Sequence, residues 1–553
     1  MNVLFSMFTY LIQVMLPFMG ILIIGCCFKS LFSNLSFRHP LIALINKTTG
    51  EKIPIVYWEN SIGRDKHCDI VVNSPTASRD HAVLYRRDEG WFISDTNSKG
   101  GVYLNGTPIS EDEKVYIDDI IQIGGINYEL RKSDVFYDES EKNSLKNSYN
   151  KFYAGGSLLI LVSFFQAFCT VQMCFSGSSF NYEPLKIFGL LLGISWASFF
   201  VSKYIIRRSN FELETLGIFL SSIGIINSAG VDVKLTYTQI ICLGIGIIFF
   251  EIILAFIKDP DISMKFRPYI AVIALILLAI NLVFGKVKNG SQNWVMLGPF
   301  SFQPSEIVKV AFVFFGSSTI KGIQTTKNLT LFILFSVACM GALFLMNDFG
   351  TACIFFVTFI LIAFMRSGSI RTVVLTCAAA VIGAGFILKF KPHIVTRFSA
   401  WRHVWEHIND AGGYQQTRVL AYSASGGLLG LGIGKGALKH VFAAPSDLVF
   451  GMLCEEWGVI MGILIVLTIA ILGIYARSAS IRSRSAFYSI ASCCGAGMLV
   501  FQMMLNVFGV VDILPLTGVT LPFISLGGSS LISVWGILAF IKASDERTYA
   551  IKR

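Results

Sequence analysis

Residues 391–458 form a long polar segment between two apolar stretches, and their types suit chemistry on an anionic substrate. Asp447 stands where the second apolar stretch begins, and Glu455 and Glu456 follow it. An acid at the start of a membrane helix is costly to keep, so it indicates either a functional site or a helix cap. The segment also carries basic residues that could bind an anion: Lys391, Arg397, Arg402, Arg418, Lys435 and Lys439.

The composition is that of a polytopic membrane protein. Hydrophobic residues make up 54% of the 553 residues and charged residues only 14%, which excludes an ordinary soluble enzyme. The net charge of +10 suits anionic lipid headgroups. No compact basic domain stands apart, so nucleic acid is not expected as a partner. The 12 cysteines contain no CxxC pair, so neither a disulfide framework nor a zinc site is predicted.

The apolar stretches match the thickness of a bilayer and predict an α-helical protein with about thirteen spans. Residues 1–30 are expected to form an uncleaved N-terminal span, because they lack the basic start and the cleavage site of a secretory signal. Two additional spans are expected within 153–208, and about ten within 211–545. The individual spans are expected near 153–175, 184–205, 211–230, 237–257, 268–286, 304–321, 328–346, 349–366, 371–389, 447–474, 485–509 and 525–542.

The distribution of Lys and Arg predicts the orientation of these spans. Alternating them places most basic clusters on the cytoplasmic side of the membrane. The large loop at 390–446 then falls on the outer side although it is basic. An anionic ligand bound there would explain the exception.

Residues 41–131 break the membrane pattern, because short apolar stretches alternate with turn residues. This pattern predicts an inserted cytoplasmic all-β sandwich, followed by a polar linker at 132–152. The segment resembles the forkhead-associated (FHA) family, which binds phosphothreonine peptides. The resemblance rests on Ile62-Gly63-Arg64, Asp69-Ile70, Ser78-Arg79-Asp80-His81-Ala82, Asp95, Ser98 and Gly101-Val102-Tyr103-Leu104-Asn105-Gly106.

The FHA resemblance implies a phosphopeptide site made of Arg64, Ser78, Arg79 and Asn105. An arginine and a serine hydroxyl at one end of a sandwich can hold a phosphate by charge-assisted hydrogen bonds. The family usually has Asn-Gly-Thr where this chain has Gly100-Gly101-Val102, so the Asn that holds the peptide backbone is missing. An interaction sandwich that no longer binds phosphate therefore stays open as an alternative.

The membrane part resembles the SEDS family (shape, elongation, division and sporulation; the FtsW, RodA and SpoVE type) over about 211–545. The departures are mild, such as Ser446 where Thr is common. The resemblance rests on motifs that occur in order: Asn289–Gly298, Phe300–Lys309, Asn347–Thr351, Gly413–Gln415, Ser425–Gly434, Pro445–Phe450, Glu455–Gly458, Asn506 and Leu514–Ser530.

The SEDS resemblance implies that the protein polymerises lipid II, the undecaprenyl-linked disaccharide-pentapeptide, into glycan strands on the outer face of the membrane. Such polymerisation serves cell division or cell-shape control. Growing a β-1,4 glycan from an α-linked diphosphate donor inverts C1, and it needs a base and positive charge for the leaving group. Asp447 matches the family's essential acid and is expected to be that base. No cofactor is expected, except that a role for a divalent cation is left open.

The diphosphates are expected to bind Arg397, Lys435 and Lys439, with Arg402 and Arg418 as alternates. Each of these could instead contact lipid headgroups. The expected substrate site also includes Trp294, Gln415, Ser525, Glu306 and Lys309.

Two of these assignments have structural alternatives. Trp294 could be an aromatic-belt anchor. Glu306 and Lys309 lie three residues apart on one helix face and could form an intramembrane pair. His403 and His407 are spaced for a metal, but no third ligand is in register, so no metal site is predicted.

Two alternative functions remain: a lipid II flippase and a phosphorylation-regulated membrane scaffold of the wall-synthesis complex. A flippase has no need of a base at the outer mouth, so Asp447 favours the polymerase. Ser148-Tyr149-Asn150-Lys151 is a formal SxxK without its partner motifs, so transpeptidation is not expected. The expected partners are a class B penicillin-binding protein and a phosphothreonine protein or Ser/Thr kinase.

Overall fold

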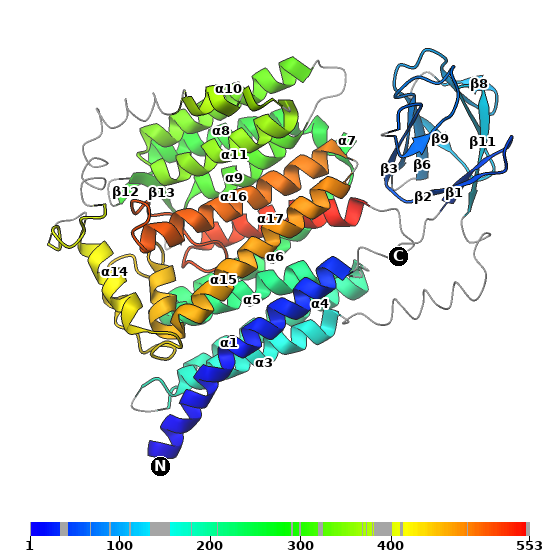
Figure 1. Ribbon diagram of the computed structural model, residues 1–553. Coiled ribbons are helices and arrows are strands. Elements are labelled where there is room, and N and C mark those ends of the chain that lie inside the picture. Colours follow the sequence, from blue (N-terminus) through cyan, green and yellow to red (C-terminus); the bar gives the residue numbers. More distant parts are fainter. Residues whose placement is uncertain are drawn as a thin grey trace.

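The computed structural model contains a bundle of helices and a β-sandwich, which lies in the chain between α1 (Asn2–Ser33) and α3 (Gly155–Cys174) (Figure 1). Residues outside the described ranges include Arg397 and most of the span expected at 371–389. The structure describes residues 2–33, 42–66, 68–87, 90–109, 112–132, 155–177, 180–206, 208, 210–288, 291–297, 300–318, 325–367, 369–371, 373–378, 380, 401–409, 413–483 and 485–548.

The sandwich consists of two sheets with strand orders β2-β1-β11-β10-β7-β8 and β4-β3-β5-β6-β9. Alternate residues point inward, as expected for a half-buried strand, and Leu44, Leu84 and Ile121 in its core are completely buried. The strands are β1 (Ile42–Asn46), β2 (Lys52–Ile55), β3 (Glu59–Gly63), β4 (Ile70–Val71), β5 (Ala82–Arg87), β6 (Gly90–Asp95), β7 (Val102–Leu104), β8 (Thr107–Pro108), β9 (Glu113–Val115), β10 (Ile120–Ile123) and β11 (Ile126–Lys132).

The helices run roughly side by side, and a small sheet of β12 (Lys286–Lys288), β13 (Ser291–Leu297) and β14 (Phe300–Phe302) joins α8 to α9. Figure 1 shows β12, β13 and α14 at one end of the bundle. The helices are α1 (Asn2–Ser33), α3 (Gly155–Cys174), α4 (Glu183–Phe200), α5 (Glu212–Ala229), α6 (Val233–Phe256), α7 (Pro260–Lys265), α8 (Arg267–Phe284), α9 (Pro304–Ser317), α10 (Thr325–Leu345), α11 (Phe349–Ser367), α14 (Tyr414–Ser425), α15 (Val449–Arg482), α16 (Ala486–Val510) and α17 (Gly528–Thr548).

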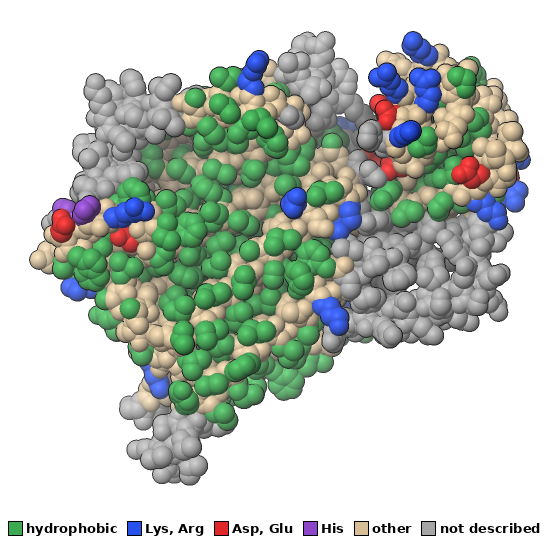
Figure 2. All heavy atoms as spheres, viewed as in Figure 1, with side chains coloured by type: hydrophobic (Ala, Val, Ile, Leu, Met, Phe, Trp, Pro, Cys, Tyr) green, Lys and Arg blue, Asp and Glu red, His purple; other side chains and the backbone are tan. Residues whose placement is uncertain are grey.

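In the described residues, 8 helices are long and apolar enough to cross a membrane, fewer than the sequence predicted. They lie in α1, α3, α4, α6, α8, α11, α15 and α16. Hydrophobic side chains cover the face of the bundle in Figure 2. On α8, for example, Val272, Ile273 and Val283 are each more than half exposed, as expected of side chains that face lipid.

The other predicted spans at 211–230, 304–321, 328–346 and 525–542 are also helices: α5, α9, α10 and α17. Several of them carry buried charges, which lowers their hydropathy. Lys542 Nζ of α17 lies 3.0 Å from Glu214 Oε2 of α5, and both side chains are almost fully buried. Ser30 Oγ of α1 donates a hydrogen bond to Glu212 Oε1 at 2.7 Å. Each acid is therefore compensated inside the bundle.

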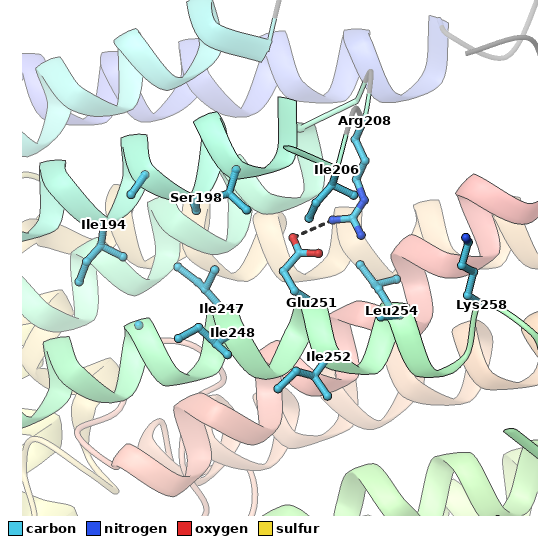
Figure 3. Close-up of a pocket in the computed structure, with 14 residues that line it drawn as sticks. Ile194, Ser198, Ile206, Arg208, Ile247, Ile248, Glu251, Ile252, Leu254 and Lys258 are labelled. Atoms are coloured by element: carbon cyan, nitrogen blue, oxygen red, sulfur yellow. Dashed lines mark hydrogen bonds and ion pairs between the residues drawn. The ribbon is translucent and has the colours of Figure 1, made fainter. Parts of the chain in front are cut away.

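The two additional helices, α3 and α4, are packed into the bundle. Gln166 Nε2 of α3 donates to Ser222 Oγ of α5 at 2.7 Å, and the rings of Phe165 and Phe219 lie 5.0 Å apart. Between α4 and α6, a cavity of about 680 Å³ is lined mainly by apolar residues. Arg208 Nη1 donates to Glu251 Oε1 at 2.7 Å beside this cavity (Figure 3).

Candidate functional site

Asp447 lies in the turn that leads into α15 and is partly buried. Its backbone N–H donates to the carbonyl of Ala443 at 2.9 Å, and Ala443 itself has a left-handed φ of 59°. The N-cap residue of α15 is Leu448, whose own side chain makes no capping hydrogen bond. Asp447 directly precedes this residue.

The backbone around Asp447 is held by α16 and by the segment before α17. Asn506 Nδ2 donates to the carbonyl of Asp447 at 2.9 Å and to that of Val519 at 2.7 Å. Ser525 Oγ donates to the carbonyl of Ser446 at 2.5 Å. The N–H of Leu526 donates to Pro445 at 2.9 Å. These contacts from α16 and the 518–526 segment fix the position of the acid.

Glu455 and Glu456, in the first turns of α15, bind backbone N–H groups of residues 434–438, which precede this helix in the chain. Glu455 accepts backbone N–H bonds from Ala437 at 2.8 Å and Leu438 at 2.9 Å. Glu456 accepts from Gly434 at 2.8 Å and from Gly436 at 3.2 Å. Both side chains are about 1% exposed. Charge-assisted bonds of this kind satisfy the buried carboxylates and fix the loop.

Two glycines allow the loop and α15 to come into contact. Gly458 has a φ of 85° and a non-helical conformation that kinks α15. A Cβ on Gly458 would lie 2.2 Å from the carbonyl oxygen of Leu428, and one on Gly430 would lie 2.3 Å from that of Glu456. Only glycine fits where two backbones approach this closely.

The described basic residues of the loop lie in three different settings. Lys435 is exposed and lies between Gly434 and Gly436. Lys439 is partly buried, and its Nζ donates to the carbonyl of Gly434 at 2.7 Å. The guanidinium carbons of Arg402 and Arg418 lie over the rings of Trp401 and Tyr414 at 5.1 and 5.3 Å. Arg397 lies outside the described residues.

The segment at 401–409 and helix α14 are attached to the loop that follows α16. The N–H of Arg402 donates to Asp512 Oδ1 at 3.4 Å, and burial raises the pKa of Asp512 above its usual value although Arg402 opposes the shift. Gln416 Nε2 donates to the carbonyl of Gly509 at 2.7 Å. Gln415, an expected substrate residue, donates to the carbonyl of Phe442 at 2.9 Å. The amide of Gln415 therefore contacts the turn that carries Asp447.

Trp294 lies on β13, opposite Lys286 of β12. Asp348, just before α11, connects this sheet to the bundle. Its Oδ2 accepts from Asn293 Nδ2 at 3.2 Å and from Gln303 Nε2 at 3.4 Å. Its Oδ1 accepts from the N–H of Thr351 at 3.1 Å. Asp348 thus fixes the strand that carries Trp294.

Glu306 and Lys309 form a buried ion pair in the bundle. Lys309 Nζ donates to Glu306 Oε1 at 2.8 Å and to Gln502 Oε1 at 3.1 Å. Ser533 Oγ donates to Glu306 Oε2 at 2.9 Å. Gln502 Nε2 in turn donates to the carbonyl of Thr520 at 3.0 Å. The pair therefore connects α9, α16 and α17, and Gln502 links it to the 518–526 segment that supports Asp447.

A search for metal ligands covers the described residues alone. In these ranges, no group of three or more His, Cys, Asp and Glu side chains is placed to hold a metal ion. His403 Nδ1 lies 3.4 Å from Glu406 Oε1, and both side chains are largely exposed.

In the sandwich, Arg64 and Ser78 lie side by side at one end. The N–H of Arg64 donates to the carbonyl of Ser78 at 2.9 Å. His81 orders the Ser78 loop, because its Nδ1 accepts from the N–H of Ser78 at 2.9 Å and its Nε2 lies 3.0 Å from the carbonyl of Gly101. The N–H of Lys99 donates to Ser78 Oγ at 3.0 Å. Arg64 and Arg79 are exposed beside this loop.

Asn105 lies at the other end of β7 from Gly101. Its Nδ2 donates to Asp119 Oδ1 at 2.9 Å, and its Oδ1 accepts from the N–H of Ile120 at 2.9 Å. The side chain thus closes the turn before β10. The structure brings Arg64 and Ser78 together but does not bring Asn105 to them.

Three residues of the site were missing from the sequence-based set of candidates. Asn506 and Asp348 were quoted only as parts of motifs, and Gly518 only as part of a longer run. Gly518 has a φ of 70°, and a Cβ there would lie 3.3 Å from Asp447 Oδ2. A polar residue inside an apolar helix, such as Asn506, is the signal that could have identified a buried hydrogen-bonding partner.

This fold and this site define a polytopic helical membrane protein that carries an FHA domain, since a model of the FHA domain matches residues 60–124. The chain belongs to the FtsW/RodA/SpoVE family of cell cycle proteins, whose model matches residues 211–548. The match leaves α1, the sandwich, α3 and α4 outside the family's own region.

Several relatives are named for peptidoglycan synthesis or sporulation. A probable peptidoglycan glycosyltransferase FtsW of Wigglesworthia glossinidia brevipalpis is 31% identical over 308 residues, covering 54% of this chain and 80% of that protein. Stage V sporulation protein E of Bacillus subtilis is 30% identical over 306 residues, or 53% and 82% of the two chains. Peptidoglycan glycosyltransferase RodA of Mycobacterium tuberculosis is 26% identical over 319 residues, or 54% and 67%.

A solved chain shares the fold of the membrane domain. It comes from a peptidoglycan synthase complex that was described for the structural coordination of polymerization and crosslinking. The TM-score is 0.51 with 24% sequence identity, and the match covers 61% of this chain and 98% of that chain.

Proposed function

We propose that this protein is a peptidoglycan glycosyltransferase that polymerises lipid II on the outer face of the cytoplasmic membrane. The observation that carries the proposal is the placement of Asp447. Its backbone is fixed by Asn506, and that of neighbouring Ser446 is fixed by Ser525. A general base needs a fixed position relative to the hydroxyl that it deprotonates. The family relationship adds relatives named as glycosyltransferases.

In the proposed reaction, Asp447 accepts the proton of the sugar hydroxyl that attacks C1 of the donor. The new glycosidic bond forms as the bond from C1 to the diphosphate oxygen breaks, and C1 is inverted. The leaving diphosphate takes the negative charge, which nearby cations would stabilise. Lys435, Lys439 and Arg397 are the proposed cations. Lys435 and Lys439 suit this role because Glu455 and Glu456 fix the backbone on which they stand.

The other residues predicted for the substrate site are assigned different roles according to their contacts. Trp294 and Gln415 are proposed to line the substrate path. Ser525 is proposed to act through the backbone of Ser446 instead of touching substrate. Glu306 and Lys309 are proposed to act as an internal support, because the pair is buried and its charges are mutually compensated. The proposed chemistry routes no step through a divalent cation.

The proposed topology has about thirteen spans, with α5, α9, α10, α17 and the span predicted from the sequence at 371–389 added to the eight apolar ones. The sandwich is then cytoplasmic. Arg64, Ser78 and Arg79 are proposed to bind a phosphothreonine peptide from a partner or a Ser/Thr kinase. A class B penicillin-binding protein is the proposed partner for crosslinking. The solved complex with a similar fold is a peptidoglycan synthase assembly, which supports that choice.

The function is tested by incubating fluorescent lipid II with the purified protein and a class B penicillin-binding protein whose transpeptidase is blocked. Glycan strands from the wild type, and none from Asp447→Ala, are expected. If neither the wild type nor Asp447→Ala makes strands, but labelled lipid II crosses the membrane of proteoliposomes that contain the protein, the protein is a flippase and not a polymerase. If lipid II is neither polymerised nor moved, the protein is a scaffold. Strands from both proteins would make Asp447 structural.

A further inference from the structure

The N-terminal helices contact the glycine-rich segment at 429–434 although they lie outside the family's region. Gln13 of α1 donates its Nε2 to the carbonyl of Leu429 at 3.0 Å, and to that of Gly430 as well. Gln13 stands in an apolar helix that has no charged residue before Lys29. An amide in such a helix is costly unless it is hydrogen-bonded, so these two carbonyls account for its presence.

Helix α3 reaches the same segment. Gly432 has a φ of 104°, and a Cβ there would lie 3.3 Å from Gln172 Nε2 and 3.8 Å from Gln13 Oε1. A Cβ on Gly434 would lie 3.2 Å from Ser176 Oγ, just beyond the end of α3. Gln172 is 2% exposed. Two buried or half-buried amides from different helices therefore lie against Gly432.

The segment is also held by α15. The N–H of Leu431 donates to the backbone carbonyl of Glu455 at 2.8 Å. The N–H of Gly432 donates to the backbone carbonyl of Glu456 at 2.9 Å. The segment is thus enclosed between the start of α15 and the N-terminal helices. Without these contacts, a run containing glycines at 430, 432 and 434 would be free to adopt many conformations.

We propose that Gln13 and Gln172 are positioning residues of the outer-face site. Gln13 fixes the glycine segment by hydrogen bonds and Gln172 by packing against Gly432. Through the segment they position the backbone of Lys435 and Lys439, which come after it in the chain. The assignment of those lysines to the diphosphate rests on the proposed function, whereas the fixing of the segment does not. The FHA domain lies in the chain between α1 and α3, so it is joined at both ends to helices that hold this segment.

The test compares hydrogen–deuterium exchange of the full-length protein in Gln13→Glu, Gln13→Ala/Gln172→Ala and the wild type. Gln13→Glu has the same shape but loses the donor N–H and places a carboxylate against two carbonyls. The matched control is Gln166→Ala, which removes a buried glutamine from α3 that contacts Ser222 instead of the segment. Faster exchange, by about 10-fold or more, is expected at residues 429–434 in the first two variants and not in the control.

The same variants are then assayed for lipid II polymerisation. Gln13→Glu is expected to lower kcat/KM roughly 5- to 10-fold, with thermal unfolding close to that of Gln166→Ala. Unchanged exchange at 429–434 in both test variants would overturn the proposal. The exchange measurement does not depend on activity. A wild type without polymerase activity would therefore refute the proposed function and leave this inference to be decided by exchange alone.

Discussion

Gly518 approaches Asp447 so closely that a Cβ on residue 518 would lie 3.3 Å from Asp447 Oδ2. Gly518 also has a φ of 70°, in the region that favours glycine. The space in front of the carboxylate therefore depends on a residue without a side chain, 71 positions later in the chain.

Gly518→Ala is expected to impair the site in two ways. The left-handed backbone would cost about 1–2 kcal/mol, and the methyl group would crowd the carboxylate of Asp447. A displaced base lowers the rate of strand formation by about 10- to 100-fold. The control is Gly527→Ala, where a Cβ would meet Ser530 at an ordinary 3.6 Å. Equal polymerisation rates for the two variants would show that Gly518 does not shape the site.

Gly100→Asn is expected to improve phosphopeptide binding by the FHA domain. The position has room, because a Cβ there would lie 3.4 Å from the carbonyl oxygen of Thr76 and 3.6 Å from His81 Cε1. An added amide that holds the peptide backbone is expected to raise the affinity for a phosphothreonine peptide about 10-fold. Fluorescence anisotropy on the full-length protein measures it, with Arg64→Ala as the variant that abolishes binding. A peptide that binds equally well without its phosphate would contradict the assignment.

Glu306→Ala is expected to destabilise the bundle, because it leaves the Lys309 ammonium buried with one partner fewer. Breaking a buried pair costs about 3–5 kcal/mol, so thermal unfolding in detergent should move to a clearly lower temperature. The double variant Glu306→Gln/Lys309→Met removes both charges and should recover part of the loss. If Glu306→Ala unfolds like the wild type but raises KM for lipid II, the pair binds substrate instead.

The sequence predicted the site as a set of motifs but not the contacts between them. Asp447 was identifiable because an acid at the start of an apolar stretch is unusual. Its partners Asn506 and Gly518 lie 59 and 71 residues further on, and only the packing of α16 against the 518–526 segment brings them to it. The role of Gln13 was hidden for the same reason, because its partners are backbone carbonyls of a distant loop.

The hydropathy pattern predicted where the helices lie in the chain better than it predicted their lengths and kinks. Helix α9 begins at Pro304 and has only 14 residues, and it includes a buried ion pair that shortens its apolar stretch. Helix α15 continues to Arg482 with a kink at Gly458, which a hydropathy pattern does not record. Asn105 was grouped with Arg64 because of its motif, although β7 carries it away from Gly101 to pair with Asp119.

The central claim, that Asp447 is the general base, is tested most directly by the initial rate of strand formation in Asp447→Asn. The asparagine keeps the shape of the side chain but cannot accept the proton, so the rate should fall at least about 100-fold, with unchanged thermal unfolding. Asp512→Asn, a second acid outside the membrane-spanning helices, should retain the wild-type rate. A rate for Asp447→Asn within a few-fold of the wild type would contradict the account.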